Sequence, residues 1–287
     1  GTIQYGGCTF CNADGSGSGL MQKGLSLTKQ WEYWLDKFSK SDRLKNTKNF
    51  LAYMQSYSNT YGCLEKLEKM TTELASLEKC VGFSIGTRPD CIDEEKLRLL
   101  ASLPFQTKWI EFGIQSMHDE TLKRIRRGHS VQCSVDAITR SRKYNLNVCV
   151  HLMAGIPGET KENFLDTVRE VCKLPVQGIK LHGLYVCKNT QLAKDYRANA
   201  YTPMEQEDYI RLICDALCII PSNIAIHRLT ADCHDEELIA PEWAKLKGHI
   251  VRGIEGLLFH EGKWQGCKND VPLENPYTAL YKKLERL

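Results

Sequence analysis

The feature that most constrains the fold of this 287-residue chain is a regular alternation of short apolar segments with longer amphipathic ones. The apolar segments, which we predict to be buried strands, are 49–57, 81–87, 109–116, 147–155, 178–186 and 223–230. The amphipathic segments, which we predict to be helices, are 64–78, 93–103, 131–145, 161–174 and 204–220. Strands that alternate with helices in this way form a parallel sheet, so the sequence predicts an α/β fold of the barrel type.

Two helix starts are marked by capping residues. Asp93 precedes the acidic run Glu94–Glu95, and Thr160 follows a tight turn with Glu162 two residues later. Side-chain oxygens at such positions accept hydrogen bonds from the first helical N–H groups. We therefore predict that helices begin at these two points.

The chain is expected to be organised as one barrel core followed by a smaller segment. The core covers 1–234 and includes a polar, Gly- and Ser-rich excursion at 12–48 that turns helical. Residues 235–287 are less periodic, and we predict that they cap the barrel.

Polar or glycine residues follow several of the predicted strands. These stretches are SNTYG (58–62), GTRPD (86–90), GIQS (113–116), with RIRRGHS (124–130) one helix later, and HLMAGIPGET (151–160). The carboxyl ends of parallel strands share one edge, where (β/α) barrels hold their active sites, so these residues should form a single rim. Each stretch alone has a plainer explanation: a tight turn at GIPGET, a solvated face for the arginines and a core position for His151.

A C-x-x-C pair, Cys8 and Cys11, lies in the stretch GGCTFC and has the spacing of metal ligands. A structural zinc site would need two more Cys or His residues at short spacing, but the next cysteine is Cys63. Most other cysteines lie in apolar segments and are expected to behave as small hydrophobic residues; examples are Cys149, Cys187, Cys214 and Cys218. The odd total of 13 argues against a disulfide framework and for a reducing cytoplasm.

Composition and charge exclude few classes of protein; the one that the sequence argues against is a protein with a membrane-spanning helix. No apolar run reaches the roughly 18 residues that span a bilayer. The net charge of +3 permits a nucleic-acid partner without arguing for one.

The combination of these motifs resembles the radical S-adenosylmethionine (SAM) superfamily, and within it the branch that contains the catalytic subunit of Elongator and its small bacterial relatives. The matching stretches are GGCTFC, YSNTYG, GFSIGTRPD, EFGIQS, RRGHS and HLMAGIPGET, and the resemblance runs from Cys8 to about Trp243. It implies a partial (β/α)6 barrel, a [4Fe–4S] cluster held by three cysteines, and SAM on the fourth iron. One electron from the cluster then cleaves SAM to a 5′-deoxyadenosyl radical that abstracts hydrogen from a substrate.

By this resemblance Cys8 and Cys11 are two of the three cluster ligands. The resemblance places the third cysteine and the first barrel strand upstream of Gly1. Cys63 is expected to begin a helix and is a poor substitute for the third ligand.

The resemblance also implies the residues that bind SAM. Ser58, Asn59 and Thr60 stand where relatives carry a Gly-Gly-Glu-like turn at the SAM amino group, and Gly86 stands where relatives often carry a glutamate. These two departures put the details of SAM binding in question, not the class.

The remaining implied SAM contacts match the family more closely: Gln115 and Ser116 at the end of the third predicted strand, Arg127 toward the SAM carboxylate, His151 toward the ribose, and Gly155 and Gly158 in the turn beside the adenine. A guanidinium suits the carboxylate because its fork of donors binds both oxygens.

The Elongator-like relatives act on the wobble uridine of tRNA, so the resemblance implies a tRNA substrate modified at carbon 5, and a reductant of the flavodoxin or ferredoxin type. Basic clusters that could meet phosphates are 45–48, 123–127, 140–143 and 245–247, and tryptophans that could stack a base are Trp31, Trp34, Trp243 and Trp264. Core or surface packing is the plainer explanation for the tryptophans.

Three alternatives stay open at this stage. A radical SAM enzyme could act on a small molecule such as a porphyrinogen, since RRGHS is also similar to that oxidase family. A regulator could keep the cluster without catalysis. A zinc-binding structural module is the third alternative, and it lacks its further ligands.

Overall fold

The computed structural model describes residues 7–11, 20, 23–55, 57–231 and 236–268. Parts of the predicted 12–48 excursion and of the 235–287 capping segment lie outside the described residues. Among the described residues, no helix is long and apolar enough to cross a membrane.

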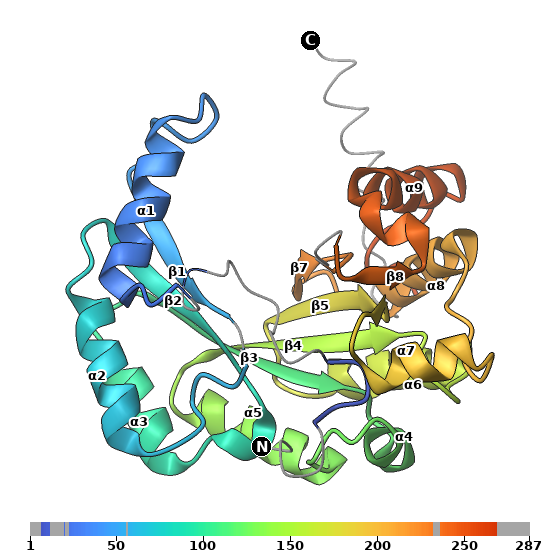
Figure 1. The fold of residues 1–287 in the computed structure, drawn as a ribbon, viewed down its shortest axis with the longest axis horizontal. Helices are drawn as coiled ribbons and strands as arrows, with labels where there is room; N and C mark the ends of the chain where they lie inside the picture. The colour runs from blue at the N-terminus through green and yellow to red at the C-terminus, as the bar shows by residue number, and fades with distance from the viewer. Residues whose placement is uncertain (1–6, 12–19, 21–22, 56, 232–235, 269–287) are drawn as a thin grey trace. The chain divides into compact units, whose positions relative to one another are not determined.

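Helices and strands alternate along most of the chain (Figure 1). The helices are α1 (Leu27–Ser39), α2 (Leu64–Ala75), α3 (Glu94–Ser102), α4 (Asp119–Arg124), α5 (Val131–Lys143), α6 (Lys161–Cys172), α7 (Gln191–Arg197), α8 (Gln206–Ile219) and α9 (Lys247–His260), with 3-10 turns η2 (Pro89–Cys91) and η3 (Glu242–Lys245). The strands are β1 (Phe50–Met54), β2 (Cys80–Thr87), β3 (Thr107–Gln115), β4 (Asn147–Ala154), β5 (Gly178–Gly183), β6 (Val186–Cys187), β7 (Ala225–Arg228) and β8 (Leu238–Ala240).

One sheet contains all six predicted strand segments, in the order β1-β2-β3-β4-β5-β7. The pairs β1–β2, β2–β3 and β5–β7 are parallel, as the alternation predicts. The predicted segment 178–186 is divided, because β5 ends at Gly183 and the short β6 pairs antiparallel with β8 in a second sheet.

Both predicted helix caps are confirmed. The Asp93 carboxylate accepts a hydrogen bond from Lys96 N at 2.9 Å, at the start of α3. Thr160 forms a reciprocal capping box with Asn163 at the start of α6. Cys63 occupies the N-cap position of α2, as predicted, and is exposed.

The tail is more regular than the sequence suggested. Instead of an irregular segment, residues 247–260 form α9, which packs against α8. Gly253 allows this contact, since a Cβ at that position would lie 2.7 Å from Ile210 Cδ1.

The described chain divides into two compact units, and the division runs through β3 and β4. Unit 1 comprises 13–114 and 132–150, and unit 2 comprises 2–12, 115–131 and 151–287. The sequence-based boundary at 234 stays a prediction.

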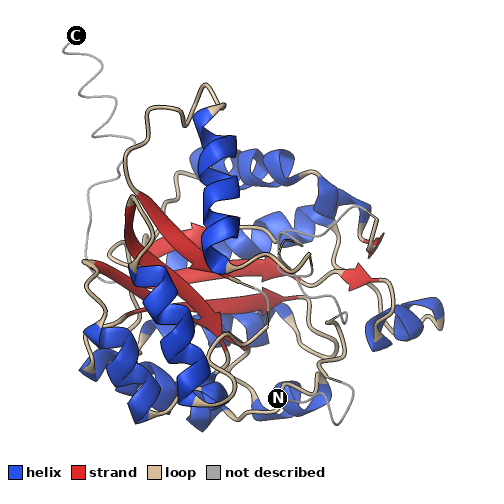
Figure 2. Cartoon of the chain, turned by 60° about the vertical axis from the view of Figure 1, so that its left-hand side comes forward, coloured by secondary structure: helices blue, strands red, loops and turns tan. Residues whose placement is uncertain are grey.

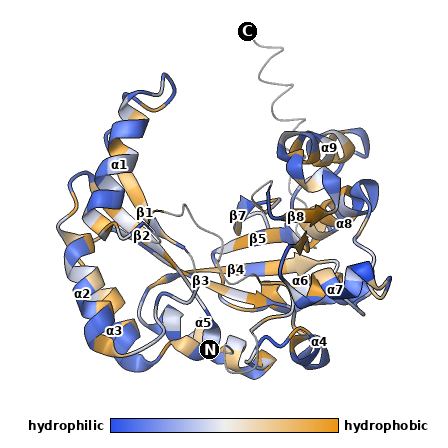
Figure 3. Cartoon of the chain, in the orientation of Figure 1, coloured by the Kyte–Doolittle hydropathy of each residue, from blue (hydrophilic) through white to orange (hydrophobic). Residues whose placement is uncertain are grey.

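Each unit has its own apolar core. In unit 1, Phe83 and Ile85 of β2 and Ile110 and Phe112 of β3 are fully buried. Helices lie along the outer side of these strands (Figures 1 and 2). In unit 2, the fully buried residues include Tyr209 and Ile213 of α8 and Ile250 and Ile254 of α9. Figure 3 shows the same pattern, with hydrophobic colouring along the strands and hydrophilic colouring on the outer sides of the helices.

Candidate functional site

Backbone hydrogen bonds hold the C-x-x-C turn within unit 2. Cys11 N donates to Cys8 O at 3.2 Å, which closes the turn. Thr9 N donates to Ile125 O at 3.1 Å, just beyond α4, and Thr9 O accepts from Leu192 N at 2.9 Å, at the start of α7. The two thiols are therefore carried by a loop that is hydrogen-bonded on both sides.

Phe10 anchors the same turn through its side chain. It is half-buried and packs against two apolar clusters, one with Leu122, Ile125 and Ile156, the other with Leu184, Val186 and neighbouring residues. Burial of an aromatic ring at this point fixes the position of Cys8 and Cys11 on either side of it.

Arg127 points at the first of the two thiols. Its Nη1 lies 3.4 Å from Cys8 Sγ, and both residues are only 8% exposed. The chain takes a left-handed step at Arg126 (φ 55°) after α4, so that Arg126 is exposed while Arg127 is directed inward. A cation beside a thiol favours the thiolate, which is the form that binds iron.

The thiols also influence each other. A hydrogen bond with Cys8, followed by the surrounding protein atoms that partly screen the thiol from water, raises the pKa of Cys11, although the residue as a whole is exposed. The Arg127 charge acts in the opposite direction. The charge on Cys187 contributes to the same upward shift, which places that thiol near the turn. Cys187 is half-buried, whereas Cys149, Cys214 and Cys218 are buried in the core as predicted.

Gln115 ends β3 with a strained backbone and an unusual side chain. Its φ is 71°, which is uncommon for a residue with a Cβ. The side chain is 8% exposed, and Oε1 is buried without a hydrogen-bond partner among the described residues. A buried acceptor of this kind has room for one further donor beyond the described residues.

Ser116 is bound within the protein. Its Oγ donates to Glu159 Oε1 at 2.6 Å and accepts from His118 N at 3.1 Å. Glu159 was not singled out from the sequence, although it lies in the GIPGET stretch. Burial raises the pKa of Glu159, and its contact with Ser116 ties the turn after β4 to the end of β3.

The GIPG turn depends on two left-handed glycines, Gly155 (φ 82°) and Gly158 (φ 76°). Tyr201 Oη donates to Gly155 O at 2.8 Å, and Arg124 Nη1 donates to Pro157 O at 2.8 Å. A Cβ on Gly158 would collide with the Arg124 guanidinium, so no other residue fits there without a shift.

His151 on β4 has a second histidine as its neighbour. Its ring centroid lies 5.2 Å from that of His182 on β5, which is 8% exposed. His151 lies on β4, which leads to the GIPG turn, and His182 lies on the neighbouring strand β5.

In unit 1, the side chains of the predicted SAM turn hold the loop itself. Asn59 Nδ2 donates to Gly86 O at 2.9 Å, and Thr60 Oγ1 donates to Cys91 O at 2.6 Å. Burial raises the pKa of the Cys91 thiol, and a hydrogen bond with Ser58 acts in the opposite direction. The side chains of Asn59 and Thr60 are therefore engaged within the loop, and Asn59 N also donates to Gly86 O at 3.1 Å.

Several residues predicted to contact RNA have contacts within the protein instead, and others lie on the surface. Within 123–127, Arg124 and Arg127 have the internal contacts described above, and Lys123 pairs with Glu120 on the surface at 2.6 Å. Trp31 donates to Glu78 O at 2.9 Å, and Trp243 stacks on Tyr209 with centroids 5.1 Å apart. These two tryptophans have packing roles.

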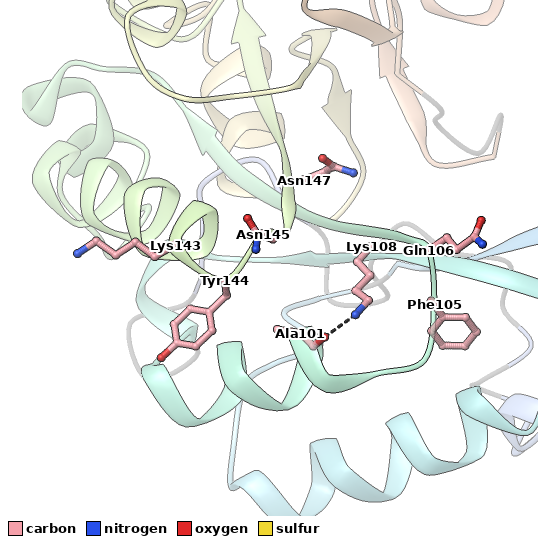
Figure 4. A pocket seen from close by; sticks show the side chains of 8 residues that line it. All are labelled: Ala101, Phe105, Gln106, Lys108, Lys143, Tyr144, Asn145 and Asn147. Atoms are coloured by element: carbon pink, nitrogen blue, oxygen red, sulfur yellow. Dashed lines mark hydrogen bonds between the residues drawn. The ribbon is translucent and has the colours of Figure 1, made fainter.

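A cavity of about 560 Å³ lies elsewhere in unit 1 (Figure 4). It is lined by Lys108, Tyr144 and Asn147, among others, and Lys108 Nζ donates to Ala101 O. These residues belong to the amino ends of β3 and β4, the edge opposite the one that carries catalytic residues in (β/α) folds. We therefore do not assign it to the candidate site.

Comparison with known proteins gives the class that this fold and site define. The chain matches the model of the radical SAM superfamily over residues 5–171 and that of the radical SAM C-terminal domain over residues 176–258. It therefore belongs to the radical SAM superfamily. The enzymes of this superfamily use a [4Fe–4S] cluster and SAM, so the chain is a radical SAM enzyme.

Individual relatives place it in the Elongator-like branch. YtqA of Bacillus subtilis is 35% identical over 267 residues, which are 93% of this chain and 82% of YtqA. The tRNA uridine(34) acetyltransferase of Dehalococcoides mccartyi is 32% identical over 210 residues, covering 72% of this chain and 44% of that enzyme. The structure of archaeal Methanocaldococcus infernus Elp3 superimposes with a TM-score of 0.72 at 19% identity, over 87% of this chain and 62% of that one, and confirms the predicted fold class.

Proposed function

We propose that this radical SAM enzyme modifies the carbon-5 side chain of the wobble uridine of tRNA. In this proposal Cys8 and Cys11 bind the cluster. SAM is bound by the other residues that the resemblance singled out: Ser58, Asn59, Thr60, Gln115, Ser116, Arg127, His151, Gly155 and Gly158.

One observation carries the assignment of the site. Within unit 2, the Cys8–Cys11 turn is hydrogen-bonded between α4 and α7, and Arg127 Nη1 lies 3.4 Å from Cys8 Sγ. Two thiols with an adjacent guanidinium fit an iron–sulfur cluster that carries a bound carboxylate ligand. Gln115 Oε1, which accepts no hydrogen bond from the part of the chain that the structure describes, fits the same ligand, because SAM offers amine and hydroxyl donors.

When bound, the cluster supplies the electron for reductive cleavage of SAM. The chain's own residues bind and orient. Arg127 offers a forked donor to a carboxylate, Gln115 offers an acceptor, and the left-handed Gly155 lets the backbone approach a flat ring. The capping box of α6 and the Ser116–Glu159 hydrogen bond fix the turn that presents these groups.

The tRNA substrate is supported by relatives and not by an RNA-binding module. The Dehalococcoides relative is named a tRNA uridine(34) acetyltransferase, but this chain spans less than half of its length. The shared part is the radical SAM part, so the proposal concerns uridine chemistry and not acetyl transfer. A flavodoxin- or ferredoxin-type reductant and a cytoplasmic location belong to the same proposal.

The test is anaerobic production of 5′-deoxyadenosine by the enzyme loaded with iron and sulfide, with SAM and a strong reductant, in the presence and absence of bulk tRNA. We expect production that rises with tRNA, followed by a mass change at the wobble uridine. Production that ignores tRNA would support a small-molecule substrate instead. No production from a loaded cluster would support a non-catalytic regulator.

Cys8→Ala and Cys11→Ala serve as controls, since each should abolish both cluster loading and SAM cleavage. SAM cleavage that persisted in either variant would contradict the cluster assignment. RNA binding gives an independent measure, because affinity for tRNA should fall steeply with salt.

A further inference from the structure

Unit 1 has a polar face that the proposed SAM site does not use. We define it by Tyr53 on β1, Ser84 on β2, and Trp109 and Glu111 on β3. Strand residues alternate between faces, and the opposite face holds the apolar core residues Phe83, Ile85, Ile110 and Phe112. These four polar or aromatic residues therefore share the face of the strands opposite the apolar core residues.

The sheet register aligns three of them in one row. Tyr53 pairs with Ser84, and Ser84 pairs with Trp109. Neighbouring strands lie about 4.8 Å apart, so the backbones that carry the two aromatic residues are about 10 Å apart, with only a serine side chain between them. The separation between the strands that carry Tyr53 and Trp109 is thus about twice the usual centroid distance of two aromatic rings in contact, which is about 5 Å.

The hydroxyl end of Tyr53 is fixed by a buried carboxylate. Tyr53 Oη donates to Glu111 Oε2 at 3.2 Å, and Ser84 Oγ donates to Glu111 Oε1 at 2.6 Å. Glu111 is 2% exposed, whereas Tyr53 is 41% exposed. The ring is thus held at its polar end while a large part of its surface remains accessible.

Tyr53 also lies one residue before the end of β1. In (β/α) folds the residues near the carboxyl ends of the strands contact the substrate. An exposed, oriented aromatic ring at that position is suited to a planar partner, and base–aromatic stacking is the usual way in which proteins bind unpaired nucleotides.

We propose that the substrate base stacks on the Tyr53 ring, with Glu111 and Ser84 holding the ring in place. The ligand class is a single unpaired nucleobase, and this inference rests on the proposed RNA substrate. It assigns a specificity residue to β1 of unit 1, which is not among the residues proposed to bind SAM.

The test measures RNA binding while two things are varied independently: the Tyr53 side chain of the protein and the base at the wobble position of the RNA. The probes are an anticodon stem-loop RNA with uridine at the wobble position and the same RNA with an abasic nucleotide there. Tyr53→Leu should weaken binding of the uridine RNA by about 5- to 100-fold and leave the abasic RNA unchanged. Tyr53→Phe keeps the ring and should stay within about threefold of the wild type.

Tyr33→Leu is the matched control, because Tyr33 on α1 is similarly exposed at 47% and lies outside the polar face. Tyr33→Leu should leave the affinity for the uridine RNA and for the abasic RNA unchanged. The affinity for SAM should also be the same in Tyr53→Leu as in the wild type, and thermal unfolding monitors the fold of each variant.

The outcomes separate this inference from the proposed function. If tRNA stimulates 5′-deoxyadenosine formation while Tyr53→Leu binds both RNAs like the wild type, the Tyr53 site is wrong and the function stands. Equal weakening of both RNAs, or a loss of SAM affinity alone, also overturns the site. If the wild type binds neither RNA, the proposal of an RNA substrate is wrong, and the proposed stacking site at Tyr53 is wrong with it.

Discussion

Arg127 and Cys8 are 119 residues apart in the sequence, yet Arg127 Nη1 lies 3.4 Å from Cys8 Sγ. The contact connects the thiol pair to the turn after α4, within unit 2. It puts a permanent positive charge beside the proposed cluster ligands, where the resemblance also expects the SAM carboxylate.

The first prediction concerns this arginine. Arg127→Ala should weaken SAM binding roughly tenfold to a hundredfold, because a charge-assisted contact contributes about 1.5–3 kcal/mol. Arg127→Lys should recover only part of the loss, since an ammonium lacks the forked geometry. Equilibrium dialysis of labelled SAM against the reconstituted enzyme measures both. Arg169→Ala, at an exposed surface pair with Glu162, is the control that should bind SAM normally; an unchanged affinity in Arg127→Ala would remove Arg127 from the site.

The second prediction concerns Gly158. Gly158→Ala should lower the free energy of unfolding by about 1–3 kcal/mol, because alanine is strained at φ 76° and its Cβ would displace the Arg124 guanidinium. Gly256→Ala is the matched control in α9, where a Cβ has open space, and it should stabilise the protein by about 0.5–1 kcal/mol. Urea denaturation compares the two. Equal effects of both substitutions would show that Gly158 is not constrained by the turn.

Much of this fold could be predicted from local sequence signals. The six apolar segments become one sheet, and the capping residues Asp93 and Thr160 mark the helix starts. Helix α9 was not predicted because Gly248, Gly253 and Gly256 weaken its helical signal. It packs on α8, and a Cβ at Gly253 would lie 2.7 Å from Ile210 Cδ1, so the Ile210 side chain would have to shift.

The candidate site could be predicted only as a set of residue types at strand ends. The cysteine spacing and the Gln-Ser pair are visible in the sequence. The Ser116–Glu159 hydrogen bond joins residues 43 positions apart, and the inward turn of Arg127 depends on a left-handed step at Arg126. Such contacts are properties of the packed chain, and no spacing rule encodes them.

The third prediction is a pH dependence caused by Glu159. Burial raises the pKa of its carboxyl above the ordinary value of 4.5, so the folded state favours the protonated form. The contribution of the protonated Glu159 carboxyl to the free energy of unfolding is then complete below pH 4.5. It is lost as the pH rises through the folded-state pKa. Glu159→Gln has no carboxyl to ionise and should not lose this contribution. As the pH increases from 4.5 toward neutrality, the free energy of unfolding of the variant should therefore rise relative to that of the wild type.

Urea denaturation at a series of pH values checks this result. Glu162→Gln, an exposed carboxylate in the first turn of α6, is the control for a general charge effect. A variant-minus-wild-type difference that does not change with pH would mean that Glu159 has the same pKa in both states.

The fourth prediction tests whether Phe10 holds the thiol turn. Phe10→Ala should lower the free energy of unfolding by about 1–3 kcal/mol, less than the loss at a fully buried phenylalanine because Phe10 is half-buried. The Thr9 amide, which donates to Ile125 O, should exchange faster with deuterium in this variant, and the reconstituted cluster should be lost sooner. Phe10→Leu should retain most of both properties, and Phe259→Ala, at an exposed position in α9, should affect neither. If Phe10→Ala loses stability while Thr9 exchanges at the wild-type rate, the ring contributes to the apolar clusters without positioning the cysteines. The backbone hydrogen bonds to Ile125 and Leu192 would then be sufficient to hold the turn.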